Sequence, residues 1–166
     1  EAKSDMEKKV ILCKVLDGAG RVIFSVTARA WFEQIVYDVI KRGEYLDHKT
    51  ICKYWVAARN KVYGDTVDWF SEMESEWGIT PHYFMANFRF YNYPYVYAQL
   101  FVYALYQKYL EEGKAFVPKL KQILSAGGSI SPMEIGKTVG FDISSVDFWK
   151  IGMKQYGISL ENWKKS

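Results

Sequence analysis

Histidine and cysteine, two side chains that often hold transition metals in proteins, are scarce in this sequence. Its 166 residues include two of each: His48 and His82, Cys13 and Cys52. The two histidines lie far apart, and we read no zinc-motif spacing around either cysteine. The sequence therefore predicts that this chain alone binds no metal. It also predicts that the cysteines are small buried hydrophobic residues in a reducing compartment.

Motifs of self-contained catalysis are also missing. The sequence has no His-Glu-x-x-His helix, no Gly-x-Ser-x-Gly string and no phosphate-binding loop with its lysine. Gly18-x-Gly20 is too short for a nucleotide fingerprint and is interpreted as a plain turn. The chain therefore carries no complete catalytic centre of these types.

Long apolar runs and a strong charge imbalance are absent as well. No apolar run reaches about 18 residues, and no secretory signal is visible. The net charge is +3, with lysines and glutamates interspersed, so the short lysine patches are interpreted as solvated helix faces. We expect a cytoplasmic protein that binds neither membrane nor nucleic acid.

Nearly every segment has the apolar spacing of a helix, which predicts an all-α, multi-helix bundle over residues 1–166. We expect helices over 8–16, closed by a turn at 17–20, then over 21–43 and over 47–64 with Asp47 as the N-cap. A short helix begun by Asp65 follows, then a helix start at Thr80-Pro81, a helix over 94–112 and three shorter ones over 116–124, 132–139 and about 145–156. The chain begins Glu1-Ala2-Lys3 rather than with Met, which indicates a single helical domain or a fragment of a longer polypeptide.

Aromatic residues are concentrated between His82 and Tyr106, where 11 of 25 positions are aromatic and seven are tyrosines. A purely structural core needs only aliphatic side chains. A buried tyrosine hydroxyl without a hydrogen bond costs roughly 1–3 kcal/mol. The run therefore indicates either a wall of hydrogen-bond donors along a cleft or an aromatic-rich buried helix.

Six strings in order along the chain carry a family resemblance. They are Trp31-Phe32-Glu33, Val62-Tyr63-Gly64-Asp65, Glu76-Trp77-Gly78, Pro81-His82-Tyr83-Phe84, Phe88-Arg89-Phe90-Tyr91-Asn92-Tyr93-Pro94-Tyr95 and Phe141-Asp142-Ile143-Ser144. Together they resemble the oligoendopeptidase F family, which belongs to the thimet-oligopeptidase-like zinc metallopeptidases. The resemblance runs from about Ile23 to about Tyr156. It implies the C-terminal portion of the catalytic domain, downstream of the His-Glu-x-x-His segment.

The resemblance also implies roles for residues across the cleft from the metal. His82 matches the family's downstream histidine, and Tyr91 and Tyr95 match its tyrosines, so these three are the candidate catalytic residues. The candidate substrate-binding residues are Arg89, Tyr93, Tyr97 and Gln99. Gln99 is a departure, because many family members have a tyrosine there in a Gly-Tyr-Leu-Phe string. No residue of this chain is expected to ligate zinc.

The function implied by the resemblance is zinc-dependent hydrolysis of internal bonds in short peptides. Zinc would be held by the upstream part of the same polypeptide. This chain, inactive alone, would supply the cleft wall and donors to the developing oxyanion. The alternative is a standalone all-helical peptide-binding or interaction module without catalysis. We also expect an exposed apolar face, including some of Tyr91, Tyr95 and Tyr97, that a dimer could cover.

Overall fold

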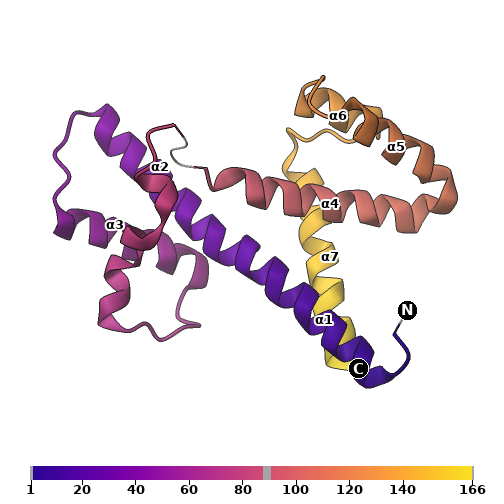
Figure 1. Cartoon of the computed structure of the whole chain (residues 1–166), viewed down its shortest axis with the longest axis horizontal. Coiled ribbons are helices and arrows are strands. Elements are labelled where there is room, and N and C mark those ends of the chain that lie inside the picture. The colour runs from indigo at the N-terminus through magenta and orange to yellow at the C-terminus, as the bar shows by residue number, and fades with distance from the viewer. Residues whose placement is uncertain (1, 88–90, 166) are drawn as a thin grey trace. The chain divides into compact units, whose positions relative to one another are not determined.

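A computed structural model describes residues 2–87 and 91–165, and its ordered elements in these ranges are all helical. The prediction of an all-α chain is confirmed (Figure 1). The chain divides into two compact units, one formed by residues 20–97 and the other by residues 1–19 together with 98–166. None of the helices described is both long enough and apolar enough to span a bilayer.

The unit of residues 20–97 is built on two packed helices, α2 (Thr27–Lys41) and α3 (His48–Tyr63). A short π-helix, η1 (Arg21–Val26), leads into α2. Asp47 begins α3 as predicted, because its carboxylate accepts a hydrogen bond from the backbone N–H of Thr50 at 2.7 Å. Gly64 ends α3 with a φ of +58°, a conformation that glycine adopts without steric cost.

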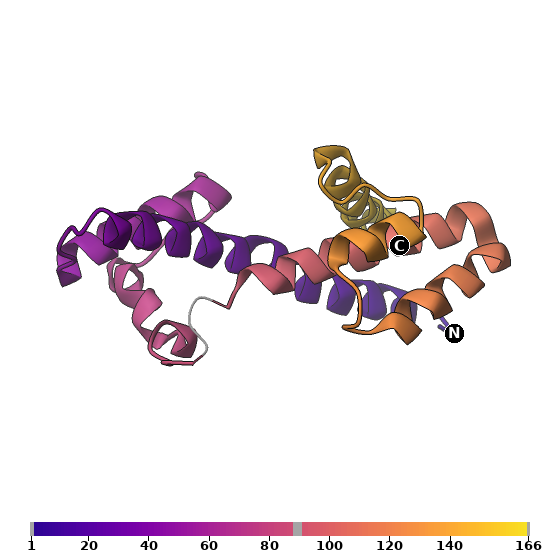
Figure 2. The same cartoon turned by 90° about the horizontal axis from the view of Figure 1, so that it is seen from above.

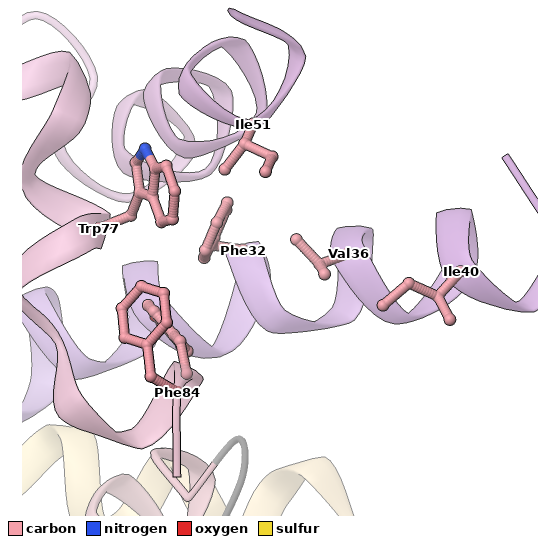
Figure 3. Close-up of a pocket in the computed structure, with 7 residues that line it drawn as sticks. Phe32, Val36, Ile40, Ile51, Trp77 and Phe84 are labelled. Carbon is pink, nitrogen blue, oxygen red and sulfur yellow. The ribbon is translucent and has the colours of Figure 1, made fainter. Parts of the chain in front are cut away.

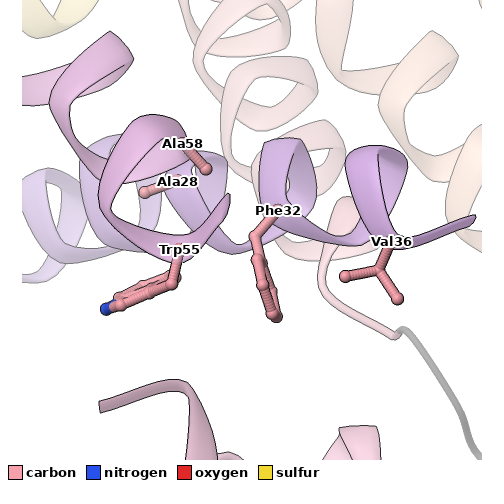
Figure 4. Packing of buried hydrophobic residues seen from close by; sticks show 5 residues of the cluster. All are labelled: Ala28, Phe32, Val36, Trp55 and Ala58. Carbon is pink, nitrogen blue, oxygen red and sulfur yellow. The ribbon is translucent and has the colours of Figure 1, made fainter. Parts of the chain in front are cut away.

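The core of this unit lies where α2 meets α3 (Figure 4). Ala28 and Ala58 are each only 1% exposed, and their small side chains let the two helices approach closely. Phe32 and Trp55 meet edge to face with their ring centroids 5.7 Å apart, a favourable aromatic geometry. Val36 extends the buried cluster one turn further along α2. This packing fixes one face of α2 against α3.

The segment after α3 differs from the sequence prediction. Instead of a helix begun by Asp65, two 3₁₀ helices follow, η2 (Ser71–Ile79) and η3 (Pro81–Tyr83). The carbonyl oxygen of Met73 accepts hydrogen bonds from Trp55 Nε1 at 3.1 Å and from Arg59 Nη1 at 3.2 Å, both on α3. Tertiary contacts thus satisfy a backbone acceptor that a longer α-helix would use internally.

The turn predicted at residues 17–20 is also wrong. Helix α1 (Asp5–Gly20) runs through these residues, and Gly20 has right-handed helical angles of φ −59° and ψ −44°. Glycine inside a helix costs about 1 kcal/mol relative to alanine, but this cost alone does not end a helix. Gly18 and Gly20 therefore weaken the helix without forming a turn.

The other unit contains most of α4 (Tyr93–Glu112), followed by η4 (Gly113–Phe116), α5 (Val117–Ala126), α6 (Pro132–Thr138) and α7 (Val146–Lys165). The chain reverses direction between α4 and α5, where Gly113 has a φ of +62° (Figure 2). A capping box of Ser131 and Glu134 begins α6, where the sequence predicted a helix over 132–139. Helix α7 continues nine residues beyond the predicted end at 156, as far as Lys165.

Candidate functional site

An apolar pocket of about 260 Å³ lies beside the core of the 20–97 unit (Figure 3). Phe32, Val36 and Ile40 line it from α2, because residues four apart lie on one face of a helix. The other lining residues are Ile51, Trp77, Tyr83 and Phe84. Apolar walls of this kind suit an aliphatic or aromatic side chain.

Arg29 of α2 binds the segment that leads to His82. Its Nη2 lies 3.2 Å from Oε1 of Glu76, and its Nε donates to Oγ1 of Thr80 at 3.3 Å. A further hydrogen bond joins Nη1 to the hydroxyl of Ser25, one turn earlier on the same helical stretch. Thr80 is itself buried at 7% exposure. The side chains of Glu76 and Thr80, just before Pro81-His82, are therefore bound to α2 by the guanidinium group of Arg29.

Glu33, one turn after Arg29, binds the segment at its other end. Glu33 is 4% exposed and Asn92 is 3% exposed, so both polar side chains are buried. Nδ2 of Asn92 donates to Oε1 of Glu33, and the backbone N–H of Asn92 donates to the same carboxyl group. Burial raises the pKa of Glu33 above its usual 4.5, because the charged form is poorly solvated. The hydrogen bonds from Asn92 and the charge of Arg29 lower that pKa, but less strongly.

Three of the predicted tyrosines, which are close to Asn92 in the sequence, lie together in the structure. We refer to Tyr91, Tyr93 and Tyr95 as the tyrosine cluster. The rings of Tyr91 and Tyr95 meet edge to face at 5.9 Å, and those of Tyr91 and Tyr93 lie 6.5 Å apart. The three residues are 37%, 66% and 44% exposed, in chain order. Their phenols therefore belong to an accessible aromatic surface, and a neutral phenol is a ready hydrogen-bond donor.

His82 lies in η3, and its Nδ1 is shielded from solvent. The hydroxyl of the neighbouring Tyr83 is shielded as well. Burial raises the pKa of Tyr83 well above 10, and the negative charge of Glu33 raises it further. The phenol of Tyr83 is therefore held in its neutral form beside the apolar pocket.

The remaining predicted residues are not brought into the tyrosine cluster by the contacts described. Tyr97 is half-buried, and burial raises the pKa of its phenol. Gln99 falls in the other unit, where it forms a side-chain hydrogen bond with Tyr103. Arg89 lies outside the described residues.

Arg29 and Glu33 were missed as site residues by the sequence interpretation. A signal was present, since both are charged residues within the apolar spacing of α2 and Glu33 directly follows the core residue Phe32. Their partners are 51 and 59 positions away in the sequence, however. The pattern of one helix could mark the two charges as unusual but could not identify what they bind.

His48 and Cys52 form a pair that the sequence interpretation also overlooked. They lie four residues apart on α3, with Nε2 of His48 and Sγ of Cys52 separated by 3.6 Å. Nε1 of Trp77 donates to the same sulfur at 3.4 Å. Within 2–87 and 91–165, no group of three or more His, Cys, Asp or Glu side chains could hold a metal ion. Because even an open catalytic zinc site takes about three protein ligands, these donors do not fit the zinc that the resemblance implies.

Comparisons with known proteins agree on one family. The sequence matches Peptidase family M3 over residues 2–155. It is similar to "Oligopeptidase PepF" of Bacillus subtilis (strain 168), with 25% identity over 163 residues that cover 98% of this chain and 24% of that protein. It is also similar to "Oligoendopeptidase F, plasmid" of Lactococcus lactis subsp. cremoris, with 26% identity over 165 residues that cover 99% of this chain and 27% of the relative.

The chain thus spans about a quarter of the length of these curated relatives. No solved structure gives a significant match. The family match nonetheless covers almost every residue of the sequence, including the pocket, Arg29, Glu33 and the tyrosine cluster. This chain belongs to peptidase family M3.

Proposed function

We propose that residues 1–166 form the C-terminal helical part of the catalytic domain of a cytoplasmic, zinc-dependent oligoendopeptidase. In this proposal the chain forms one wall of a cleft that binds short peptides and supplies hydrogen-bond donors to the reacting carbonyl group. Support comes from the family match and from relatives that are named as oligopeptidases and oligoendopeptidases. The chain's share of their length supports its being one part of a larger enzyme.

The observation that carries the proposal is the tyrosine cluster and its attachment to α2. Tyr91 and Tyr95 have accessible rings in edge-to-face contact, and Asn92 between them is buried against Glu33. When water attacks a peptide carbonyl, negative charge collects on the carbonyl oxygen. Donors that interact more strongly with that oxyanion than with the ground-state carbonyl accelerate the reaction. The phenol hydroxyls of Tyr91 and Tyr95 are our proposed donors.

The other predicted residues have supporting roles in this proposal. His82 donates directly or orients a tyrosine, since an imidazole carries both a donor and an acceptor when neutral. Tyr93 and Tyr97 contact the bound peptide, and Gln99 and Arg89 stay candidates for that role from the family resemblance. The apolar pocket, which Tyr83 lines, receives an apolar side chain.

The zinc ion belongs to the upstream part of the same polypeptide in this proposal. The chain alone would then be inactive, because a catalytic zinc site takes about three protein ligands and the described residues offer no such group. The first test is the reading frame of the gene. A frame that continues upstream into a His-Glu-x-x-His helix supports the proposal. A start codon directly before Glu1 would instead favour a standalone peptide-binding or interaction module.

The second test uses the complete gene product loaded with zinc. Changing Tyr91 or Tyr95 to Phe removes one hydroxyl and keeps the ring, so kcat should fall by on the order of 10²–10³ with a modest change in KM. His82→Ala should also lower kcat. Tyr45→Phe is a matched control, because Tyr45 is 88% exposed and belongs to a loop between α2 and α3. Near-normal rates in both the Tyr91 and the Tyr95 variant would contradict the assignment of the donors.

A further inference from the structure

We infer that Arg29 and Glu33 of α2 are positioning residues for the proposed donors. They bind the two ends of the segment that carries His82 and Tyr91: Arg29 binds Thr80, and Glu33 binds Asn92. This inference rests on the proposed function, because it assigns the two residues a task only if the segment takes part in the reaction. It gives neither residue direct contact with substrate.

The geometry places both contacts on one rigid support. Arg29 and Glu33 are four residues apart on α2 and therefore project from the same side of the helix. The helix is fixed by the buried packing of Phe32 against Trp55 of α3. A displacement of one end of the segment would thus require either a broken hydrogen bond or a shift of a packed helix.

The contact between Glu33 and Asn92 is directional as well as buried. The carboxyl group accepts two donors from one residue, the side-chain amide and the backbone N–H of Asn92. The backbone carbonyl of Asn92 in turn accepts from the N–H of Tyr95 at 3.2 Å, in the first turn of α4. Glu33 therefore holds the residue that precedes α4, with Tyr91 directly before it and Tyr95 in the first turn of the helix.

Stability alone is a poor explanation for a carboxyl group in this place. Burying a charge carries a desolvation cost that its hydrogen bonds often do not recover, and apolar replacements of buried ionic groups are often neutral or stabilising. Catalysis, by contrast, is sensitive to placement, since an error of about 1 Å in a reacting group can cost about 10²-fold in rate. A buried carboxyl group that accepts two hydrogen bonds from Asn92 suits the need of catalysis for accurate placement.

The decisive experiment is a reciprocal exchange in the complete, zinc-loaded gene product. Asn92→Asp alone places two carboxyl groups in contact, and we expect kcat per folded enzyme to fall about 10²-fold while KM changes less than about threefold. Adding Glu33→Gln restores one amide and one carboxylate in exchanged positions. The double variant should then recover most of the lost kcat, which a double-mutant cycle measures as coupling.

Two further measurements separate positioning from a purely structural role. Hydrogen exchange of the backbone amides at residues 91–93 and 95–97 should become faster in Asn92→Asp and return toward the original rate in the double variant. Activity of Asn92→Asp should rise as the pH is lowered within the range where the enzyme stays folded, because protonating either carboxyl group relieves their repulsion. A structural role would change the folded fraction but leave the kcat of the folded enzyme and its pH profile unmoved.

Glu44→Gln is the matched control, because it is the same substitution at an exposed glutamate, which forms an ion pair with Arg42.

If Asn92→Asp does not fold, Arg29→Lys provides the test. A lysine cannot reproduce the contacts of the guanidinium with both Thr80 and Glu76, so kcat should still fall with little change in KM. Normal kcat in Arg29→Lys and in the folded Glu33 and Asn92 variants would overturn the inference. If Tyr91→Phe and Tyr95→Phe are impaired while those variants are normal, the proposed function stands and only the positioning role of Arg29 and Glu33 is overturned. Normal rates in Tyr91→Phe and Tyr95→Phe would overturn both the proposed function and the positioning role.

Discussion

Replacing Gly152 by alanine should destabilise the unit that contains α4 and α7. Gly152 is a buried glycine of α7 that lies directly against the backbone of α4. A Cβ atom built there would lie 2.5 Å from the carbonyl oxygen of Leu100 and 3.0 Å from its Cα atom. Ordinary van der Waals contact begins at 3.4 Å, so the nearest contact is 3.4 − 2.5 = 0.9 Å too short.

The magnitude follows from two opposing effects. Because the obstructing atoms belong to the backbone, no side-chain rotation relieves the clash, and one of the two helices must shift. Overpacking of this kind costs about 1–3 kcal/mol, and a backbone obstruction favours the upper part of that range. Alanine in place of glycine in a helix interior gains about 1 kcal/mol. We therefore expect a net loss of about 1–2 kcal/mol in the free energy of unfolding.

Gly157 provides a matched control on the same helix. An added Cβ atom at Gly157 meets nothing within 4 Å, so Gly157→Ala should stabilise by up to about 1 kcal/mol. Urea unfolding followed by far-UV circular dichroism measures both variants against the original chain. If Gly152→Ala proved as stable as Gly157→Ala, the close approach of α7 to Leu100 would be wrong.

Two other predictions concern the charge of Glu33 and the metal. The pKa of Glu33 is raised above 4.5 in the folded chain, so the stability that comes from its neutral form is fully present below pH 4.5 and is lost as the pH rises through the raised value. The glutamine in Glu33→Gln cannot ionise, so the stability of the variant relative to the original chain should increase as the pH rises above 4.5. Urea unfolding at a series of pH values measures this difference. A stability difference that does not vary with pH would contradict this reasoning. The chain alone should contain no stoichiometric zinc after purification and hydrolyse no peptide, since its described residues lack a three-ligand site. One tightly held zinc per chain, with peptidase activity that a chelator removes, would refute that expectation.

Local chemistry made several helix boundaries predictable from the sequence. Asp47 begins α3 with its own side chain, Gly64 ends it with a positive φ, and Ser131 with Glu134 starts α6. Each of these signals acts over three or four residues, so it does not depend on the rest of the fold. The same short range explains why they could be read without a structure.

Boundaries that depend on tertiary contacts were predicted poorly. Asp65 is a good N-cap residue, yet the following helix starts only at Ser71 and is 3₁₀, because Trp55 and Arg59 of α3 bind the carbonyl oxygen of Met73. Gly18 is typical of turns in isolation, but the backbone there stays helical. Local propensities of about 1 kcal/mol decide such positions only when no packing opposes them.

For the candidate site, too, some features could be predicted from the sequence and others only from the structure. The sequence alone determined an all-helical chain, the dense run of tyrosines after His82 and, through motifs in order, the peptidase family. Only the tertiary structure placed Thr80 on Arg29 and Asn92 on Glu33. The physical reason is that a periodic pattern records which face of a helix is buried. A buried polar side chain, by contrast, must find a particular partner, and the fold brings that partner from dozens of residues away.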